Sequence, residues 1–278
     1  MTIDWGDGSP RSNASLAESG GSGSFSAKHT YLNGGIYTIT PTVFDDDGGL
    51  ASQTTTAVIT GAGVKNGVLQ FVGTKGNDDV SVSKQSNGQF KVQAKIFPGG
   101  SSKTFSTTGV TQIVVLLCDG DDRVQIAGDI TTQTIMDGGV GNDRLEGGAG
   151  PNVLLGAEGA DRLIGDKGRD LLIGGVGADQ LEGKDGDDIL IGGRTIFDID
   201  DDHVAAGFDE ALSAILAEWN STRTYATRVA NLRGTGSGTR LNGSYYLQNA
   251  VTVLDDSVAD ILTGSASQDW FFYKSGQD

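Results

Sequence analysis

The amino-acid sequence predicts a mainly β protein built around a repetitive solenoid, with a β-sheet module before it and a small helical hairpin after it. Three observations support this fold class. Residues 138–191 are six consecutive copies of a nine-residue unit, and the flanking segments alternate apolar and polar residues. Glycine accounts for 44 of the 278 residues, with only four prolines and no three-residue period. This composition excludes collagen and favours a turn-dense repeat.

Charge and cysteine content limit the classes of function. A formal net charge of −16 and a pI of 4.3 oppose binding to nucleic acid or anionic lipid, because both need a cationic face. Cations are the natural partners of such a surface. Cys118 is the single cysteine, so the chain cannot form an internal disulfide or a cysteine-rich zinc site. We predict no membrane span, because no apolar run is long enough, and the N-terminus has no signal-peptide pattern.

Residues 1–61 are predicted to form the β-sheet module. Alternating apolar residues from Tyr37 to Phe44 precede an Asp/Gly turn, and a Thr-rich strand follows. The segment resembles the C-terminal part of a PKD domain, an immunoglobulin-like β-sandwich. The matching motifs are Trp5–Ser9, His29–Tyr31, Gly35–Thr40, Val43 and Asp47–Gly49. The resemblance implies a partial Ig-like β-sandwich whose first strands would precede Met1, so we expect the natural protein to begin upstream.

Residues 62–136 are predicted to be a β-rich lead-in with two isolated turns that resemble the repeat. The strands are separated by Gly/Asn/Ser turns. The isolated turns run from Gly73 to Asp78 and from Asp119 to Asp122. Each is either a plain connection between strands or a further metal-binding turn, and the sequence leaves this choice open.

From Gly138 the sequence keeps one nine-residue frame: GGVGNDRLE, GGAGPNVLL, GAEGADRLI, GDKGRDLLI, GGVGADQLE and GKDGDDILI. Glycine occupies positions one and four of every copy, an acid or its amide occupies position six, and leucine occupies position eight. This pattern resembles the hemolysin-type RTX calcium-binding nonapeptide, G-G-x-G-x-D-x-U-x. The resemblance implies a parallel β-roll over 137–200, in which two copies make one coil and turns eighteen residues apart stack.

Each position of the unit is expected to have a physical role. Glycine at positions one and four would adopt positive φ and would let backbone carbonyls converge. The leucine at position eight would point into the centre of the coil from each short strand. These leucines are Leu145, Leu154, Leu163, Leu172, Leu181 and Leu190.

Position six would supply the acidic ligands for calcium, which takes roughly six to eight hard oxygens and accepts backbone carbonyls. By the resemblance, one side of the roll carries Asp143, Asp161 and Asp179, and the other carries Asn152, Asp170 and Asp188. Each side encloses two gaps, so we expect about four Ca²⁺ ions, the weakest next to the uncharged Asn152. The candidate metal-site residues are Gly138, Gly141, Asp143, Gly147, Gly150, Asn152, Gly156, Gly159, Asp161, Gly165, Gly168, Asp170, Gly174, Gly177, Asp179, Gly183, Gly186 and Asp188.

The alternative is a solenoid that folds without metal. Stacked carboxylates about one strand spacing apart repel each other unless they are neutralised, which favours the calcium-bound form. A glycine-rich coil also loses much entropy on ordering and buries only one row of leucines in return. We therefore expect this segment to be largely disordered without calcium.

After the repeats, residues 201–234 are predicted to form a helical pair, because apolar residues recur at helical spacing from Ala211 to Leu232. This apolar stripe is expected to pack on the end of the roll and to cap it. Residues 235–278 are predicted to resume the coil in degenerate form, with Asp260, Asp269 and Asp278 at intervals of nine. Whether Asp260 and Asp269 bind calcium is left open. The last copy stops at its sixth position, Asp278, so we expect truncation here too.

Two functions are consistent with these features. The first is a non-catalytic, calcium-stabilised module of a secreted or cell-surface bacterial adhesin or matrix protein. The alternative is the C-terminal calcium-dependent part of an extracellular hydrolase whose catalytic domain lies outside this chain. The only histidines are His29 and His203, and neither belongs to a zinc-protease or nucleophile-elbow motif, so no enzyme activity is predicted. A glycan or protein ligand is a further candidate partner if Trp5 stacks on a sugar, but packing of Trp5 within the module is favoured.

Overall fold

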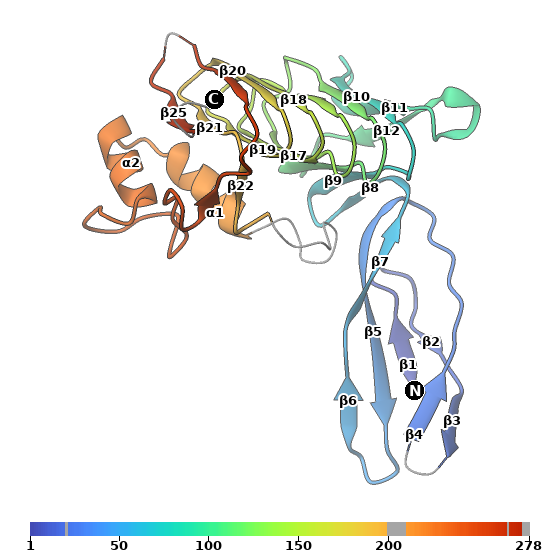
Figure 1. The fold of residues 1–278 in the computed structure, drawn as a ribbon. Coiled ribbons are helices and arrows are strands. Elements are labelled where there is room, and N and C mark those ends of the chain that lie inside the picture. The colour runs from blue at the N-terminus through green and yellow to red at the C-terminus, as the bar shows by residue number, and fades with distance from the viewer. Residues whose placement is uncertain (20–21, 199–209, 266, 274–278) are drawn as a thin grey trace.

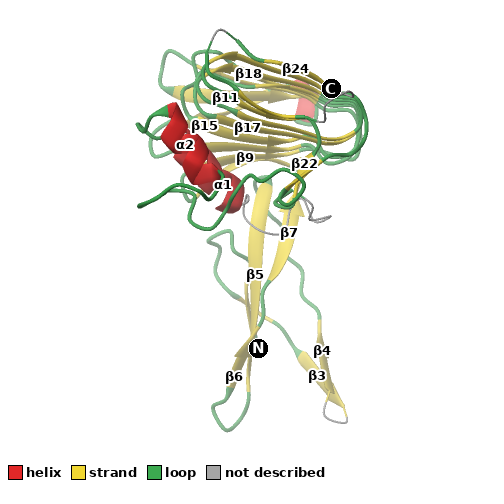
Figure 2. Cartoon of the chain, turned by 60° about the vertical axis from the view of Figure 1, so that its left-hand side comes forward, coloured by secondary structure: helices red, strands yellow, loops and turns green. Residues whose placement is uncertain are grey.

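The computed structural model describes residues 1–19, 22–198, 210–265 and 267–273. An elongated sheet at the N-terminus extends away from a roll that contains most of the remaining strands (Figure 1). Two short helices lie against one face of this roll (Figure 2). The fold is therefore mainly β, as the sequence predicts.

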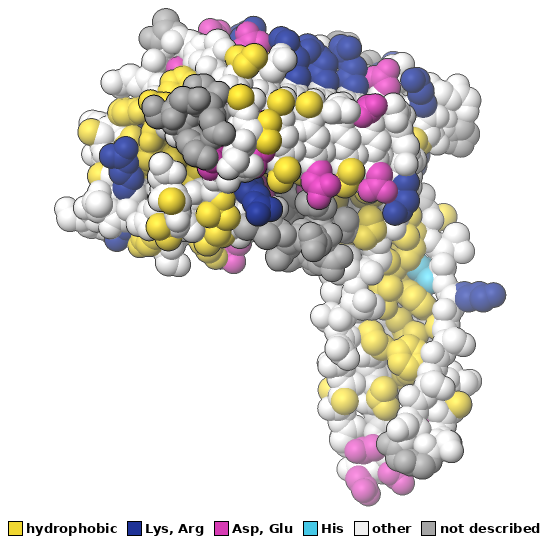
Figure 3. Space-filling view, viewed as in Figure 1, with side chains coloured by type: hydrophobic (Ala, Val, Ile, Leu, Met, Phe, Trp, Pro, Cys, Tyr) yellow, Lys and Arg dark blue, Asp and Glu magenta, His cyan; other side chains and the backbone are white. Residues whose placement is uncertain are grey.

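The roll consists of two eight-stranded sheets that the chain enters alternately. We call one of them the polar sheet, because charged side chains such as Arg144 and Glu146 lie on its outer face. Across the polar sheet the strands are β12 (Ser102–Ser106), β11 (Gln89–Ala94), β10 (Asp79–Lys84), β14 (Arg123–Ile126), β16 (Arg144–Glu146), β18 (Arg162–Lys167), β20 (Gln180–Asp185) and β24 (Ile261–Thr263). Figure 3 shows Lys and Arg side chains gathered along one edge of the roll.

We call the other sheet the covered sheet, because the helices pack on its outer face. Across this sheet the strands are β25 (Trp270–Phe272), β21 (Ile189–Ile191), β19 (Leu171–Val176), β17 (Asn152–Glu158), β15 (Gln133–Asp137), β13 (Gln112–Leu116), β9 (Val68–Val72) and β8 (Gly61–Lys65). A short 3-10 turn, η1 (Pro98–Gly100), precedes β12.

Successive coils add one parallel strand to each sheet. Leu145 pairs with Leu163, and Leu163 pairs with Leu181, so two nonapeptides make one coil, as predicted. Residues 62–136 contribute earlier coils to the same sheets, because Val80 pairs in parallel with Val124, and Val124 with Leu145.

Strands β8, β11 and β12, which precede the repeats, pair antiparallel with their neighbours, so both sheets are mixed. Within the two sheets, the strands of residues 137–200 pair in parallel, as predicted. Short turns join β8 to β9 and β10 to β11, and a short turn can connect only antiparallel strands.

The position-eight leucines fill the space between the two sheets. All six are at most 1% exposed and belong to one hydrophobic cluster that runs the length of the roll. This cluster begins with residues such as Ala62 and Phe71 in the first coil and reaches the partly buried Leu262 and Phe271 in the last. Burying a leucine side chain contributes roughly 1.5–3 kcal/mol, so this row is the main apolar stabilisation of the roll.

The N-terminal part is a single antiparallel sheet with a hairpin beside it. The sheet contains β1 (Thr2–Asp4), β2 (Ser12–Asn13), β5 (Gly35–Phe44), β6 (Leu50–Ser52) and β7 (Thr55–Ile59), and the hairpin contains β3 (Leu16–Ser19) and β4 (Ser22–Phe25). The hairpin strands are almost wholly exposed, so they bury no core against the sheet. The Ig-like sandwich predicted for residues 1–61 is therefore not confirmed.

Trp5 is packed within this N-terminal part rather than presented to solvent. Its side chain is 7% exposed, and its ring stacks on His29 with centroids 4.9 Å apart. Its Nε1 donates a hydrogen bond of 2.8 Å to Ser12 Oγ. The same His29 ring lies 2.7 Å from Asp7 Oδ2, so both aromatic residues are held by structural contacts.

The helices α1 (Glu210–Trp219) and α2 (Tyr225–Leu232) belong to a segment inserted between β21 and β24. This segment also supplies β22 (Arg194–Thr195) and β23 (Val253–Leu254), which pair with each other. Among the helices in the described ranges, none is long and apolar enough to cross a membrane.

The prediction that the helical pair caps the end of the roll is wrong. Ile215, Leu216 and Trp219 share a buried cluster with Val153 and Ile189 of the covered sheet. Figure 2 shows the two helices lying against a face of the roll and not across its end. The physical reason is that this face is apolar, because the strands of the covered sheet carry large aliphatic residues on both of their faces. It therefore requires a covering layer.

The coil resumes after the insertion, as predicted. Gln180 pairs in parallel with Ile261, and Ile189 pairs with Trp270, so β24 and β25 extend the two sheets. The continuation of this coil beyond Tyr273 lies outside the described residues.

Candidate metal centre

The aspartates at position six form a hydrogen-bonded column along one side of the roll. In each turn the Oδ1 atom accepts the backbone N–H of the aspartate in the preceding coil. The column runs from Asp78 through Asp122, Asp143, Asp161 and Asp179 to Asp260, with N–O distances from 2.6 to 2.9 Å. The structure thus places Asp143, Asp161 and Asp179 on one side of the roll and extends their column in both directions.

A second, shorter column forms the other side. Asn152 N donates to Asp170 Oδ1 at 2.7 Å, Asp170 N to Asp188 Oδ1 at 2.9 Å, and Asp188 N to Asp269 Oδ1 at 2.9 Å. The structure therefore brings together all six predicted position-six residues in two columns, and it adds Asp269 to this one.

The second carboxylate oxygen of most of these aspartates is buried and unsatisfied. Within the described residues, Oδ2 accepts no hydrogen bond in Asp122, Asp143, Asp161, Asp170, Asp179 and Asp188. Each of these six residues is at most 3% exposed. A buried carboxylate oxygen without a donor is costly, so these atoms call for a ligand with positive charge.

Backbone carbonyls converge on the same oxygens. A Cβ atom placed on Gly156 would meet Asp161 Oδ2 and the carbonyl oxygen of Gly174 in the next coil. The same arrangement recurs in both columns, since a Cβ on Gly165 would meet Asp170 Oδ2 and the Gly183 carbonyl. Glycine at position one of the repeats avoids this conflict, because a side chain there would crowd the oxygens.

Position-one glycines do not adopt positive φ, so that part of the sequence prediction is wrong. Positive φ occurs instead at position four in five of the copies, as predicted, and at position two, which was not predicted. A Cβ on Gly159 would also meet the carbonyl of Gly141, so the position-four glycines form a close-packed column of their own. Position two has positive φ even where the residue is Ala157, Asp166 or Lys184, with values of 74°, 77° and 73°.

Burial raises the pKa of these carboxyl groups far above their usual range. Neighbouring carboxylates add to the effect, and hydrogen bonds from backbone N–H groups, together with the Asn152 side chain at Asp170, oppose it. The pKa rises to about 6 for Asp143, about 7 for Asp122, Asp179 and Asp188, about 8 for Asp161, and well above 3.8 for Asp170. A cation next to these carboxyl groups would stabilise their ionised form and so lower their pKa.

The donor set fits a hard cation such as calcium. In the described part of the chain, no group of three or more His, Cys, Asp or Glu side chains gathers in a metal-binding arrangement. The ligands of any ion here must therefore be one or two carboxylates together with backbone carbonyls. Calcium accepts such a mixed oxygen set, whereas zinc and copper prefer nitrogen or sulfur ligands.

The turn of Asn152 differs from the others. Its Nδ2 atom lies 2.8 Å from Gly150 O, 2.9 Å from Asp170 Oδ1, 3.0 Å from Gly165 O and 3.2 Å from Gly148 O. An amide nitrogen surrounded by four oxygens takes the role that a cation would have. Asn152 was predicted as a weak ligand, but its side chain points its donor, and not an unpaired oxygen, at the converging carbonyls.

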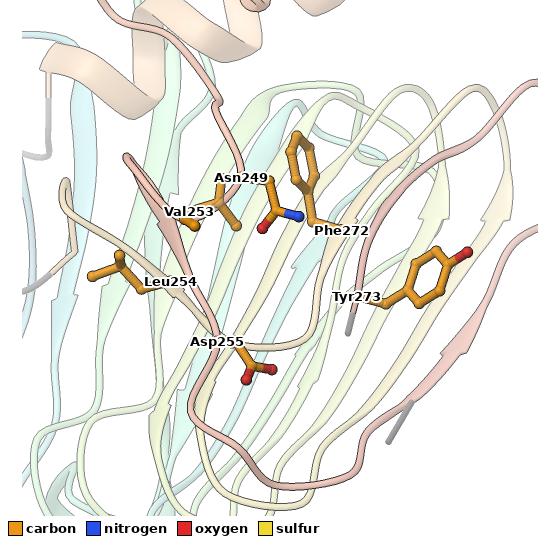
Figure 4. A pocket seen from close by; sticks show the side chains of 8 residues that line it. Asn249, Val253, Leu254, Asp255, Phe272 and Tyr273 are labelled. Carbon is orange, nitrogen blue, oxygen red and sulfur yellow. The ribbon is translucent and has the colours of Figure 1, made fainter. Parts of the chain in front are cut away.

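A pocket of about 250 Å³ lies apart from these columns, beside β23 and β25 (Figure 4). Its labelled lining residues include the apolar Val253, Leu254 and Phe272 and the polar Asn249 and Asp255. None of the aspartates in the two columns lines it.

Comparison with known proteins identifies the repeat. A family model described as the RTX calcium-binding nonapeptide repeat (4 copies) matches residues 137–172 and 164–194. The chain therefore contains RTX calcium-binding repeats, which bind Ca²⁺, and this agrees with the mixed carboxylate and carbonyl oxygens described above. The PKD resemblance of the N-terminal part receives no support. No curated protein and no solved structure matches the chain.

Proposed function

We propose that this chain is a non-catalytic module of a secreted or cell-surface bacterial protein, of the adhesin or matrix type, that folds and stiffens when it binds calcium. The single observation that carries the proposal is the pair of columns in which buried aspartate oxygens face converging carbonyls. RTX repeats support calcium binding. The module role, the location and the number of ions are our own inference.

The repeats that match the family are proposed to bind five ions rather than the four expected from spacing. Each ion would neutralise one of the buried Oδ2 atoms that, within the described residues, accept no hydrogen bond. These atoms belong to Asp143, Asp161, Asp170, Asp179 and Asp188. We expect no ion next to Asn152, because its amide already donates to the carbonyl oxygens there.

Calcium dependence also supports a location outside the cell. RTX repeat proteins are typically secreted, and the interior of a bacterium holds too little free calcium to fill such sites. Without calcium the buried carboxylates would oppose folding, because each would lose its hydration without gaining a counter-charge. The chain would therefore fold after export, when it meets a calcium-rich medium.

The placement of His29 supports the proposal that this chain has no catalytic role. His29 is stacked on Trp5, makes an edge contact with Tyr31 and is hydrogen-bonded to Asp7, so its ring is held by structural contacts. His203 lies outside the described residues. We name no particular glycan or protein partner for the module, because the Trp5 ring is packed and this does not favour stacking on a sugar.

Circular dichroism and calorimetry test this proposal. The chain is first stripped of calcium with a chelator and then titrated with calcium at neutral pH. We expect a large gain of β signal and a binding stoichiometry of about five or six ions. A β signal that is the same with and without millimolar calcium, or a stoichiometry of zero or one, contradicts the proposal.

A further inference from the structure

Nine of the turns with Asp or Asn at position six are of two kinds. In the first kind, the residue at position two has a positive φ and Oδ2 of the aspartate accepts no hydrogen bond within the described ranges. The position-two residues of these turns are Cys118, Gly139, Ala157, Asp166, Gly175 and Lys184, and their aspartates are Asp122, Asp143, Asp161, Asp170, Asp179 and Asp188.

In the second kind of turn, φ at position two is not positive and the N–H of that residue donates to the side chain at position six. Thr74 N donates to Asp78 Oδ2 at 2.6 Å, and Ser265 N donates to Asp269 Oδ2 at 2.8 Å. Gly148 N donates to Asn152 Oδ1 at 3.4 Å. The turn is thus closed by its own backbone, and the carboxylate is already satisfied.

The conformation at position two explains the difference. A positive φ rotates the peptide group, so that the N–H no longer faces the carboxylate of its own turn. The N–H of Gly175 donates instead to the carbonyls of Gly192 and Gly193 in the next coil. The carboxylate then needs a positive partner from elsewhere, and the carbonyls of neighbouring turns lie beside it.

The turn of Cys118 and Asp122 lies outside the residues that match the family, yet it has the backbone path of a matched turn. Val140 N donates to Cys118 O at 2.8 Å, just as Glu158 N donates to Gly139 O at 2.9 Å. Gly120 N donates to the Val140 carbonyl at 2.7 Å, which parallels the bond from the position-four glycine of the next turn. Cys118 has a φ of 81°, close to the 89° of Gly139.

We propose that the gap between the Asp122 turn and the Asp143 turn is an additional calcium site. The proposal rests on the proposed function, because it extends the same kind of site beyond the recognised repeats. Asp122 is 3% exposed, and its Oδ2 accepts no hydrogen bond from any described residue. The neighbouring turn of Asp78, although in the same column, is closed by Thr74 and binds no ion.

The sequence pattern does not predict this site, for two reasons. Position one of the turn is Leu117, whose side chain is part of the buried core, and not glycine. The aspartates of this turn and the next are 21 residues apart rather than 18. Because a Cβ at position one crowds the carboxylate, we expect this site to bind calcium more weakly than the sites between matched repeats.

Calcium stoichiometry in two matched variants tests the proposal. Asp122→Asn and Asp78→Asn remove one negative charge each from buried residues of the same column. Each variant keeps a side-chain oxygen for the hydrogen bond that its aspartate accepts, from Asp78 N at position 122 and from Thr74 N at position 78. We expect the wild type to bind six ions, Asp122→Asn to bind five, and Asp78→Asn to bind six. Metal analysis after equilibrium dialysis gives the count, and circular dichroism confirms that each variant is folded in calcium.

The outcomes separate this proposal from the proposed function. If the wild type binds no calcium, both fail. If the wild type and Asp122→Asn bind the same number of ions while Asp161→Asn binds one fewer, the additional site is overturned and the proposed function stands. Should Asp122→Asn fail to fold, a crystal of the wild-type chain soaked in terbium gives a second test. Anomalous density between the Asp143 and Asp161 turns, without density between those of Asp122 and Asp143, also overturns the site.

Discussion

At the residue scale, Asn152 shows how one side chain replaces an ion by a hydrogen-bond donor. Its amide nitrogen contacts four oxygens that, in the other turns, would face a cation. The substitution removes one carboxylate from the second column and gives Oδ1 of the neighbouring Asp170 a hydrogen bond from the amide. This turn therefore should hold its shape at calcium concentrations at which the other turns do not.

Asn152→Asp is expected to make folding more dependent on calcium. A carboxylate cannot donate to the Gly150 and Gly165 carbonyls, and it adds a buried negative charge beside Asp170, so an ion is needed in its place. One extra bound ion raises the calcium dependence of the unfolding free energy by about 1.4 kcal/mol per tenfold change in free calcium. Urea unfolding at several calcium concentrations measures this slope.

The control for this prediction is Asn87→Asp, which changes an exposed asparagine in a hairpin turn. Its slope should equal that of the wild type. An unchanged slope in Asn152→Asp would show that the amide does not take the role of a cation.

Position one offers a second prediction at this scale. Gly156→Ala places a methyl group against Asp161 Oδ2 and the Gly174 carbonyl, so we expect a loss of about 1–3 kcal/mol in saturating calcium and weaker calcium binding. Gly76→Ala, in a turn of the same roll, meets nothing within 4 Å and should cost less than 1 kcal/mol. Chemical denaturation of both variants provides the comparison, and equal losses would contradict the proposed crowding.

The position-six aspartates and position-eight leucines could be predicted from the sequence because their roles depend on chemical type at a fixed spacing. The positive φ at position two could not, because Ala157, Asp166 and Lys184 are not residues that favour this conformation. Hydrogen bonds to adjacent coils impose it. The conformational preferences of these residues therefore do not predict the positive φ. For the same reason, the sequence left open whether the turn of Asp122 binds metal.

At the scale of elements, the two sheets differ in what lies outside them. Repeats of the polar sheet carry residues such as Arg144 and Glu146 at positions seven and nine, whereas repeats of the covered sheet carry residues such as Leu171 and Ile173. This alternation was present in the sequence and indicates that one face of the roll is covered. The position of the helical pair could have been predicted from it, but helical spacing alone shows only that the helices have an apolar side.

Arg228 joins the helical pair to the roll, and its removal is expected to destabilise both. The guanidinium is 2% exposed, donates to Asp187 Oδ2 and to the Trp219 carbonyl, and lies 4.5 Å from the Trp219 ring centroid. We expect Arg228→Met to cost about 2–4 kcal/mol, because it leaves the partly buried Asp187 with a weaker partner. Urea unfolding in saturating calcium measures the loss.

The matched control is Arg162→Met on the polar sheet. Arg162 also pairs with a carboxylate, Glu182, but its side chain is 45% exposed, so the expected change is below about 1 kcal/mol. Similar losses in the two variants would show that Arg228 contributes only as an ordinary surface charge.

At the scale of the whole molecule, calcium should order one part of the chain and leave the other unchanged. The aspartate columns lie entirely in the roll, and the N-terminal sheet has its own aromatic cluster, in which Tyr31 stacks on Tyr37 beside His29. Hydrogen exchange followed by mass spectrometry is therefore expected to show strong protection of β13 to β21 on addition of calcium, with little change in β1 and β5. Equal protection of both parts would contradict this prediction.

The two parts nevertheless meet at a close junction. Gln70 Oε1 accepts the Ile36 N–H at 3.0 Å, Lys65 Nζ donates to the Ile36 carbonyl at 3.1 Å, and a Cβ on Gly34 would collide with Gly61. A structured roll thus fixes the direction in which the N-terminal sheet extends. The sequence predicted both parts but not this contact, because it depends on the close approach of Gly34 to Gly61 and on one partly buried glutamine hydrogen bond.

The insertion between β21 and β24 also determines the order in which the roll can assemble. Neighbouring turns in the matched repeats close loops of 18 residues, but the turns of Asp179 and Asp260 are 81 residues apart. Closing the longer loop costs about 1.3 kcal/mol more in chain entropy, before the helices within it are ordered. The last coil is therefore expected to fold after the others and to unfold first. When calcium is removed, the roll would lose its ions and unfold from its C-terminal end.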